Sequence, residues 1–239
     1  MHSTEFIKEG INDKGIFKAV FLAGLPGAGK TTIAQKITDG AVGPRHVNTD
    51  IGYEHLLQKH GVSADTSAWA LYGPQSKSLN KEMLYQYLNS MLPLFVDGTS
   101  SNSGALIRRQ GILESLGYDT AMVWINIDLE TAIHRVQQRE RKVDPKFIRD
   151  LHSKMEQNKQ FFKGKFGSNF IEVDNNNDNF DAMESKTAST ADKFFSGNVN
   201  NPIGSNTIIK MQENSEKYLI PNIYSPDHIK RMISVWYQR

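Results

Sequence analysis

Short apolar runs alternate with helical patterns along most of this chain. Five such runs each end at a polar residue or a glycine, which is typical of strands buried inside a parallel sheet. Strands are therefore predicted at residues 17–23, 46–48, 92–96, 119–127 and 169–173. Because helical patterns separate them, we predict an α/β fold in which a parallel five-stranded sheet carries helices on both faces.

The intervals between these runs carry the helices, which the periodicity predicts at 30–38, 52–60, 77–91, 104–116 and 129–139. A further helix is predicted from Pro145, since Asp144 is a good N-cap and proline is favoured at the first helical position. Tyr72-Gly73-Pro74 is expected to separate the second and third helices, because glycine and proline interrupt regular structure.

The character of the sequence changes after residue 174. A polar run rich in asparagine begins there, and residues 180–220 show weak periodicity. We therefore predict one domain at residues 1–174 and a small C-terminal extension at 175–239. The extension ends in a predicted amphipathic helix that starts at Ser225-Pro226, and its apolar stripe is Ile229, Met232, Ile233 and Trp236. Since such stripes usually belong to a core, this helix is expected to dock on the protein's own body.

Composition excludes several classes of protein. The chain has 239 residues and a net charge of +2, so bulk charge favours no particular partner. It contains no cysteine, which excludes disulfides, thiolate zinc sites and cysteine nucleophiles. No run is long enough to span a membrane, and the N-terminus MHSTEFIKEG lacks a secretory pattern. We expect a cytoplasmic protein without a membrane partner.

The segment GLPGAGKTT at residues 24–32 matches the P-loop pattern, and it follows an apolar run and opens a helix. In such a loop, glycines let successive backbone N–H groups turn towards phosphate oxygens, and the helix N-terminus adds positive charge. Lys30 is expected to reach the β- and γ-phosphates and Thr31 to bind Mg²⁺. The predicted ATP-binding residues are Gly24, Leu25, Pro26, Gly27, Ala28, Gly29, Lys30, Thr31 and Thr32.

Two other classes of P-loop protein are disfavoured. A guanine switch needs an Asn-Lys-x-Asp clamp, and the nearest segment, Asn158-Lys159-Gln160-Phe161, lacks the aspartate. Motor and transporter ATPases usually carry Asp-Glu after an apolar strand, whereas Val96-Asp97-Gly98 has no glutamate. A small kinase remains.

Two aspartates follow predicted strands on the acceptor side of the P-loop. Asp50 is the candidate catalytic base that takes the proton from an attacking hydroxyl, and its alternative role is helix N-cap. Asp97 is expected to hold a Mg²⁺-bound water or to orient the acceptor. A phosphatase of the Asp-x-Asp-Gly-Thr type is excluded, because Phe95 stands where its first aspartate would be.

Basic residues end the helix predicted at 129–139. Arg135 and Arg139 lie four apart, hence on one face, and we expect them to close over the nucleotide as a lid that stabilises the transferring phosphoryl group. Arg141 is a possible helper. The alternative is a solvated basic helix end favoured by the helix dipole.

The order of these motifs resembles the kinase domain of phage-type polynucleotide kinase and, more broadly, the zeta-toxin-like P-loop kinases. The resemblance covers about residues 17–165, and it rests on the P-loop at 24–31, Asn-x-Asp at 48–50, Asp97, and Arg-x-x-x-Arg at 135–139. It implies a P-loop three-layer sandwich that uses ATP and Mg²⁺. The residues matching Lys30 and Thr31 would bind phosphate and magnesium. The one matching Asp50 would be the base, and the one matching Arg139 would reach the donor phosphates.

Two departures from polynucleotide kinase bear on the acceptor. Tyr53 stands where that family has an arginine for the substrate phosphate, and the 175–239 extension replaces the phosphatase domain. A related phage family phosphorylates 5-hydroxymethyluracil within DNA. We predict a kinase acting on a hydroxyl of DNA, another nucleic acid or a nucleotide, at a hydroxymethylated base or a 5′-OH end, in the host cytoplasm if phage-encoded. The alternatives are a zeta-like kinase of a small metabolite or nucleotide sugar, and a nucleotide-binding regulator without an acceptor.

Three further groups of residues have two interpretations each. The stretch 159–166, which mixes lysines with phenylalanines, is either a nucleic-acid surface or the end of an amphipathic helix. Arg108 and Arg109 are candidates for an acceptor phosphate or are solvated. Trp69 and Tyr72 either line an acceptor pocket or pack a helical lobe.

Overall fold

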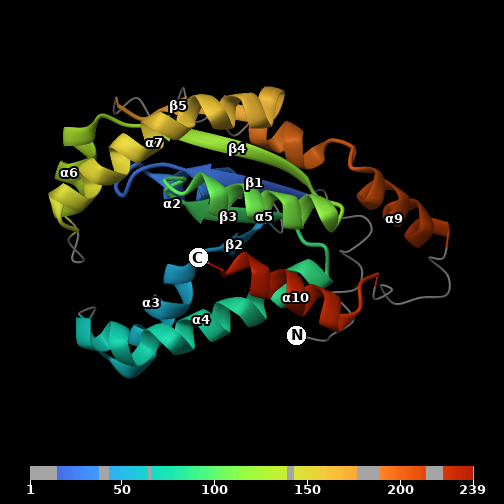
Figure 1. The fold of residues 1–239 in the computed structure, drawn as a ribbon, viewed down its shortest axis with the longest axis horizontal. Coiled ribbons are helices and arrows are strands. Elements are labelled where there is room, and N and C mark those ends of the chain that lie inside the picture. The colour runs from blue at the N-terminus through green and yellow to red at the C-terminus, as the bar shows by residue number, and fades with distance from the viewer. Residues whose placement is uncertain are drawn as a thin grey trace.

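A parallel sheet organises the molecule. The computed structural model describes residues 15–37, 43–63, 66–138, 143–176, 189–213 and 223–238. The strands are β1 (Lys18–Ala23), β2 (Arg45–Val47), β3 (Leu94–Gly98), β4 (Asp119–Asn126) and β5 (Phe170–Asp174). They run parallel in the order β2-β3-β1-β4-β5 (Figure 1). The predicted five-stranded parallel sheet is confirmed, with strand ends shifted by one or two residues.

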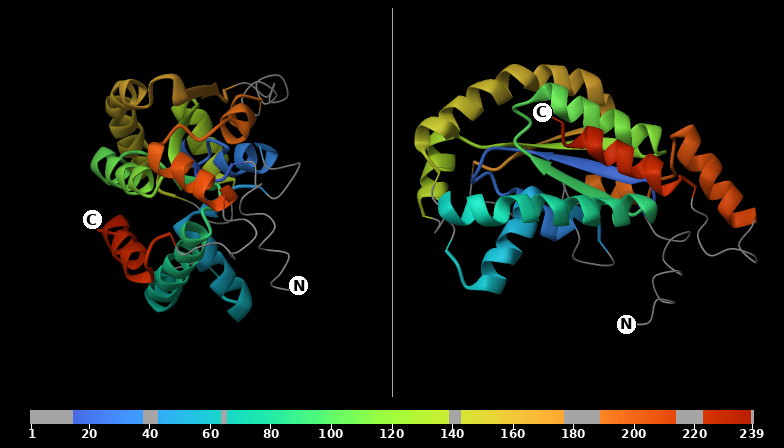
Figure 2. Two further views of the ribbon diagram at one scale, coloured as in Figure 1. Left: turned by 90° about the vertical axis from the view of Figure 1, so that its right-hand side faces the viewer. Right: turned by 60° about the horizontal axis from the view of Figure 1, so that its bottom comes forward.

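Helices connect the strands and cover the sheet. They are α2 (Lys30–Ile37), α3 (Thr49–His60), α4 (Thr66–Asn89), α5 (Ser103–Ser115), α6 (Leu129–Gln137), α7 (Pro145–Phe166), the short η1 (Gly167–Asn169), α9 (Pro202–Glu213) and α10 (Pro226–Trp236). Residues 189–196 are also helical. Figure 2 shows α5 and α7 on one face of the sheet and α2 on the other. All of β1 is buried, as expected for a central strand of a sheet covered on both faces.

One predicted break does not exist. The helix α4 is continuous through Pro74, so the expected separation at Tyr72-Gly73-Pro74 is wrong. A proline inside a helix costs roughly 3 kcal/mol. Packing of α4 against α3 offsets this cost through a small apolar cluster, whose members are Tyr53, Leu56, Leu57, Ala68 and Tyr72.

The aromatic residues of this region pack the lobe formed by α3 and α4. The ring of Tyr53 meets that of Trp69 edge-on at a centroid distance of 4.9 Å, and Tyr72 stacks on His60 at 5.0 Å. Tyr53 is 2% exposed. The structure therefore supports lobe packing, rather than pocket lining, for Trp69 and Tyr72.

The last helix, α10, docks on the body of the protein as predicted. Ser225 caps it by accepting a hydrogen bond from the backbone N–H of His228, and Pro226 occupies its first turn. Ile229, Ile233 and Trp236 are buried on the face that packs against α4 and α5. The boundary at 174/175 remains a prediction.

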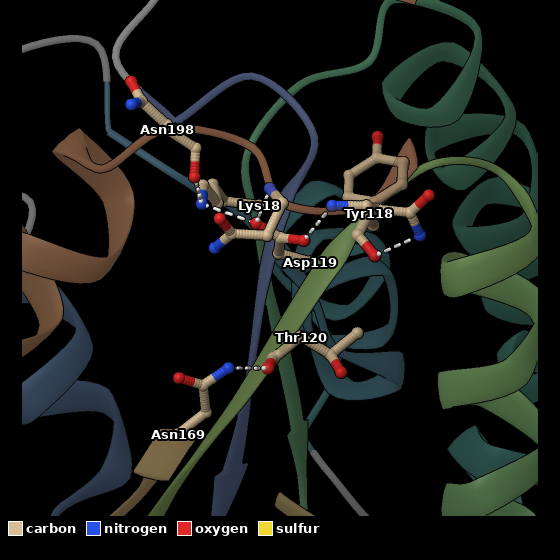
Figure 3. A network of polar contacts seen from close by, with 8 residues as sticks. Lys18, Tyr118, Asp119, Thr120, Asn169 and Asn198 are labelled. Atoms are coloured by element: carbon tan, nitrogen blue, oxygen red, sulfur yellow. Dashed lines mark hydrogen bonds and ion pairs between the residues drawn. The ribbon is translucent and has the colours of Figure 1, made fainter. Parts of the chain in front are cut away.

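Residues 198–201 are fastened to the starts of β1 and β4 (Figure 3). The ammonium group of Lys18, which is buried, lies 2.7 Å from Asp119 Oδ2 and donates to the backbone oxygen of Asn198 at 2.7 Å. Asp119 also accepts from the backbone N–H groups of Asn200 and Asn201, both at 2.8 Å. This network ties the segment after β5 to the end of the sheet opposite the P-loop.

Candidate active site

The P-loop follows β1 at the carboxyl end of the sheet, and its backbone has the shape of a phosphate cradle. Gly27 and Gly29 have φ values of 85° and 84°, in the left-handed region that favours glycine. Lys30 Nζ donates to the carbonyl oxygens of Gly24 at 2.9 Å and Leu25 at 3.1 Å. The side chain of Thr31 is exposed at the start of α2. The Lys30 ammonium thus lies within the loop, and the Thr31 side chain is open to solvent.

The P-loop packs closely against α6. A Cβ atom at Gly27 would lie 2.7 Å from the carbonyl oxygen of Ala132 and 3.2 Å from Val136. This approach places Arg135, between these two residues in sequence, on a helix that touches the loop. Arg139 and Arg141, the other predicted lid residues, lie outside the residues that the structure describes.

Asn175 braces the P-loop from the segment after β5. Its side-chain amide, which is buried, donates to the carbonyl oxygen of Ala28 at 2.8 Å. Its backbone N–H donates to Asn126 at 2.8 Å, which continues the β4–β5 pairing by one residue. This role is not visible in the sequence, because a run of asparagines carries no signal that one of them is buried.

Asp97 lies at the end of β3, paired in register with Leu22 of β1. Its Oδ2 accepts a hydrogen bond of 2.9 Å from the amide of Asn48, whereas its buried Oδ1 has no hydrogen-bond partner among the described residues. Burial raises the pKa of the Asp97 carboxyl above its ordinary value, and the nearby charge of Asp50 adds to this effect. The positive charges of Lys30 and His46 oppose it. Asp97 therefore lies buried near two positive groups and one negative group at the carboxyl end of the sheet.

Asp50 lies in the first turn of α3, directly after β2. The N-cap of this helix is Asn48, whose Oδ1 accepts a hydrogen bond of 2.8 Å from the backbone N–H of Asp50. The capping role weighed for Asp50 therefore belongs to Asn48, and the Asp50 carboxylate is not needed for it. Asn48 thus holds both aspartates at once, through its two side-chain atoms.

A cavity of about 410 Å³ opens beside Asp97 at the carboxyl ends of β1, β2 and β3. Its floor includes Phe21, Val47 and Val96, and its walls come from the loop 99–102, from α5, and from the end of α10. Thr99 and Ser101 share a hydrogen bond of 3.0 Å between their hydroxyl groups. The sequence does not predict that residues 236–238 reach this cavity, because nothing local in a terminal helix indicates where it docks.

The loop that carries these hydroxyl groups is held from α7. The amide of Asn158 donates to the carbonyl oxygens of Ser100 at 3.2 Å and Ser101 at 3.1 Å. Ser100 itself has a φ of 59°. A non-glycine residue in this region is strained, and such strain persists only where the surroundings enforce it.

The basic and aromatic stretch at 159–166 belongs to α7 and has one buried and one exposed face, with Phe161 52% exposed. Phe162 and Phe166 are buried in the main core. Lys159 lies 2.6 Å from Glu172 and also donates to Asn126 at 2.9 Å. The structure therefore favours the end of an amphipathic helix over a nucleic-acid surface. Among the described residues, none of the helices combines the length and apolar character of a membrane span.

Comparison with known proteins identifies the family. The sequence profile described as Zeta toxin matches residues 7–187. No curated protein matches the chain significantly. Among solved structures, a candidate kinase from Chloroflexus aurantiacus shares 14% identity and a TM-score of 0.52, over 74% of this chain and 97% of that one. This likeness shows the fold alone.

Two further solved structures match less closely. A gluconokinase from Sinorhizobium meliloti has a TM-score of 0.46 and 11% identity, over 74% of this chain and 95% of that one. A shikimate kinase from Bacteroides thetaiotaomicron has a TM-score of 0.45 and 11% identity, over 75% of this chain and 99% of that one.

The profile match spans well over half of the 239 residues. It confirms the zeta-toxin part of the predicted resemblance and gives no support to a phage origin or to DNA modification. The matched region contains the P-loop, Asp50, Asp97, Arg135 and Arg139. The chain therefore belongs to the Zeta toxin family of ATP-using P-loop kinases.

Proposed function

We propose that this protein transfers the γ-phosphate of ATP to a hydroxyl group of a small molecule, with nucleotide sugars and related metabolites as the candidate acceptors. The observation that carries this proposal is the cavity of about 410 Å³ beside Asp97, walled on several sides. Cavities of roughly 300–1,000 Å³ are typical of sites for small ligands. The family assignment supports the small-molecule acceptor more than the DNA acceptor predicted first.

The donor side rests on the P-loop. Lys30, which donates to Gly24 and Leu25, would exchange these carbonyl oxygens for the β- and γ-phosphate oxygens of ATP. The loop N–H groups and the N-terminus of α2 would hold the same phosphates. Arg135 and Arg139 are proposed to close over them and to neutralise charge that develops on the transferring group.

The residues near the cavity also suit Mg²⁺, a hard cation that prefers oxygen ligands. Asp97 Oδ1 is buried without a hydrogen-bond partner among the described residues, and the Thr31 hydroxyl is exposed at the start of α2. We propose that Thr31 binds the ion directly and that Asp97 binds it directly or through water. When bound, the ion would neutralise charge on the β- and γ-phosphates.

Asp50 is proposed as the base that accepts the proton of the attacking hydroxyl. It lies in the first turn of α3, directly after β2, and Asn48 rather than Asp50 is the N-cap of that helix. Asn48 would also hold Asp97 at a constant distance from the acceptor. Positioning and electrostatic stabilisation account for most of the catalysis in phosphoryl transfer, so both contacts matter for the rate.

The proposed function is tested by γ-labelled phosphate transfer across a panel of acceptors. The panel comprises UDP-sugars, sugar phosphates, sugar acids, nucleosides, 5′-OH DNA and RNA, and DNA carrying 5-hydroxymethyluracil. We expect transfer to a small acceptor, and a loss of about 10²–10⁴-fold in turnover in Asp50→Asn with ATP binding retained.

Three other outcomes would contradict this proposal in whole or in part. Transfer to DNA alone, with binding that weakens steeply as salt rises, would restore the nucleic-acid acceptor. ATP turnover that no acceptor stimulates would favour a regulator. Wild-type transfer in Asp50→Asn would remove the role of Asp50 as base.

A further inference from the structure

Arg109 brings a positive charge to the wall of the cavity beside Asp97. It lies on α5, half-buried, and its Nε is buried without a hydrogen-bond partner among the described residues. None of the ion pairs within the described part of the chain involves its guanidinium group. Since buried charges are normally paired, an arginine that lines a cavity and has no ion-pair partner within the described segments is suited to bind a ligand.

The guanidinium group of Arg109 is held in place by α10. It lies over the ring of Trp236 at 5.5 Å from the ring centroid, a cation–π contact. Burial lowers the pKa of Arg109, and Tyr237 opposes this shift. This contact restrains the guanidinium group, whose planar fork can bind a carboxylate or phosphate through two hydrogen bonds.

The end of α10 that holds Arg109 is itself secured. Arg108 Nη2 donates to the carbonyl oxygen of Gln238 at 2.6 Å, and Lys81 Nζ lies 5.6 Å from the centroid of the Tyr237 ring. Figure 2 shows α10 alongside α5 in one of its views, and α10 also packs against α4. Trp236, Tyr237 and Gln238 therefore form a built wall of the cavity.

The cavity has two electrostatically different ends. The charges that shift the pKa of Asp97 are those of Lys30, His46 and Asp50, whereas the neighbours that shift the pKa of Arg109 are Tyr237 and Arg108. One end of the cavity is thus lined by Asp97, which senses the charges of Lys30 and Asp50, and the other end is lined by Arg109. An acceptor that spans the cavity would place its hydroxyl at the Asp97 end and an anionic group at Arg109.

We propose that Arg109, stacked on Trp236, binds an anionic group of the acceptor, a phosphate or a carboxylate, and that α10 thereby makes the C-terminal segment part of the specificity site. This inference rests on the proposed function, because it assigns the cavity to the acceptor. Arg109 is a binding residue in this scheme, and α10 positions it.

The decisive experiment measures binding by calorimetry, so that it does not depend on turnover. The full-length protein is first saturated with a non-hydrolysable ATP analogue to occupy the P-loop. UDP-glucose, glucose 6-phosphate, gluconate and glucose are then titrated in separate experiments. We expect at least one anionic probe to bind about ten-fold or more tighter than glucose, since a charge-assisted hydrogen bond contributes about this much. The phosphate and carboxylate probes distinguish the two sources of the anion.

Three variants test whether the preference for anionic probes depends on Arg109. Arg109→Gln should remove the advantage of the anionic probe, and Arg109→Lys, which keeps the charge but not the fork, should retain part of it. Arg231→Gln changes an exposed arginine of α10 that does not line the cavity, and this variant should bind the probes like the wild type. If Arg109→Gln does not fold, as judged by its thermal midpoint, the Arg109→Lys result decides.

Two results would overturn the inference: equal binding of anionic and neutral probes by the wild type, or an anionic preference that survives in both Arg109 variants. Phosphate transfer separates this failure from that of the proposed function. Transfer to neutral and anionic acceptors at equal KM would retain the kinase and remove the role of Arg109. Anion binding at Arg109 without transfer to any small acceptor would retain the role of Arg109 and remove the proposed kinase activity on small molecules.

Discussion

The amide of Asn48 donates to Asp97 Oδ2 at 2.9 Å, and this contact joins the end of β2 to the end of β3 at the mouth of the cavity. The other atom of the same amide group caps α3 at the turn that carries Asp50. A single side chain thus links the carboxylate of Asp97 to the backbone of Asp50, the two residues to which the proposed chemistry assigns the metal and the base.

Replacing Asp97 should lower the activity of the protein without lowering its stability. Burial raises the pKa of this carboxyl, so its charge is destabilising in the folded state at neutral pH. Asp97→Asn should therefore unfold at a midpoint equal to or above that of the wild type at pH 7, while phosphate transfer falls by about 100-fold or more. Urea unfolding and labelled transfer, measured on the same preparation, check both parts.

The raised pKa of Asp97 also predicts in which direction the free energy of unfolding changes with pH. Between the ordinary carboxyl pKa and the raised value, the folded protein binds more protons than the unfolded chain. The wild type should gain stability relative to Asp97→Asn as the pH falls through this window, and the gap should close below it. A gap that widens on acidification would show that the folded state stabilises the charged form of Asp97.

Replacing Asn48 should change both the free energy of unfolding and the rate of phosphate transfer. Asn48→Ala removes the N-cap of α3, which costs about 1 kcal/mol of unfolding free energy, and it frees both aspartates to move. Asn48→Asp keeps a capping oxygen but brings a negative charge to Asp97. We expect Asn48→Asp to be more stable than Asn48→Ala but to remain low in activity. Equal activity in the two variants and the wild type would show that the contact with Asp97 is only structural.

Replacing Asn175 should weaken the binding of ATP more than the binding of the acceptor. Asn175→Ala removes the buried bond to Ala28 and leaves that carbonyl oxygen unsatisfied, at a cost of about 1–3 kcal/mol. The P-loop would then be less ordered, so KM for ATP should rise while KM for the acceptor stays near the wild-type value. Steady-state kinetics with each substrate varied in turn checks this. A rise confined to the acceptor KM would contradict it.

The pair of Lys18 and Asp119 is expected to be strongly coupled. The side chains are 3% and 10% exposed, so Asp119→Ala would leave a buried charge uncompensated and release residues 200 and 201. Breaking such a pair costs about 3–5 kcal/mol of unfolding free energy. The double variant Lys18→Met/Asp119→Leu should recover part of this loss in urea unfolding.

A surface pair provides the control for this experiment. Glu130 and Arg149 are 2.5 Å apart but exposed, so Glu130→Gln should leave the unfolding midpoint nearly unchanged. Comparable losses in the two single variants would show that burial does not decide the energetics of these pairs.

Local sequence determined much of the fold. Apolar runs placed the five strands to within two residues, and capping residues placed the starts of α7 and α10. The P-loop followed from glycine spacing alone. These features depend on neighbours in the chain, so a pattern is enough to find them. The misplaced break at Pro74 shows the limit, because packing between α3 and α4 outweighs a local preference.

Tertiary structure alone decided what surrounds the candidate site. Tyr53 was weighed at the acceptor side, yet it is buried against Trp69. Arg109 had two interpretations until α10 placed Trp236 beside it at the cavity wall. Asn175 became part of the nucleotide side only through its bond to Ala28, 147 residues away in sequence. The sequence by itself determined the sheet and the phosphate cradle, because both arise from local spacing. The acceptor end joins segments far apart in the chain, and their meeting depends on which faces the whole fold buries together.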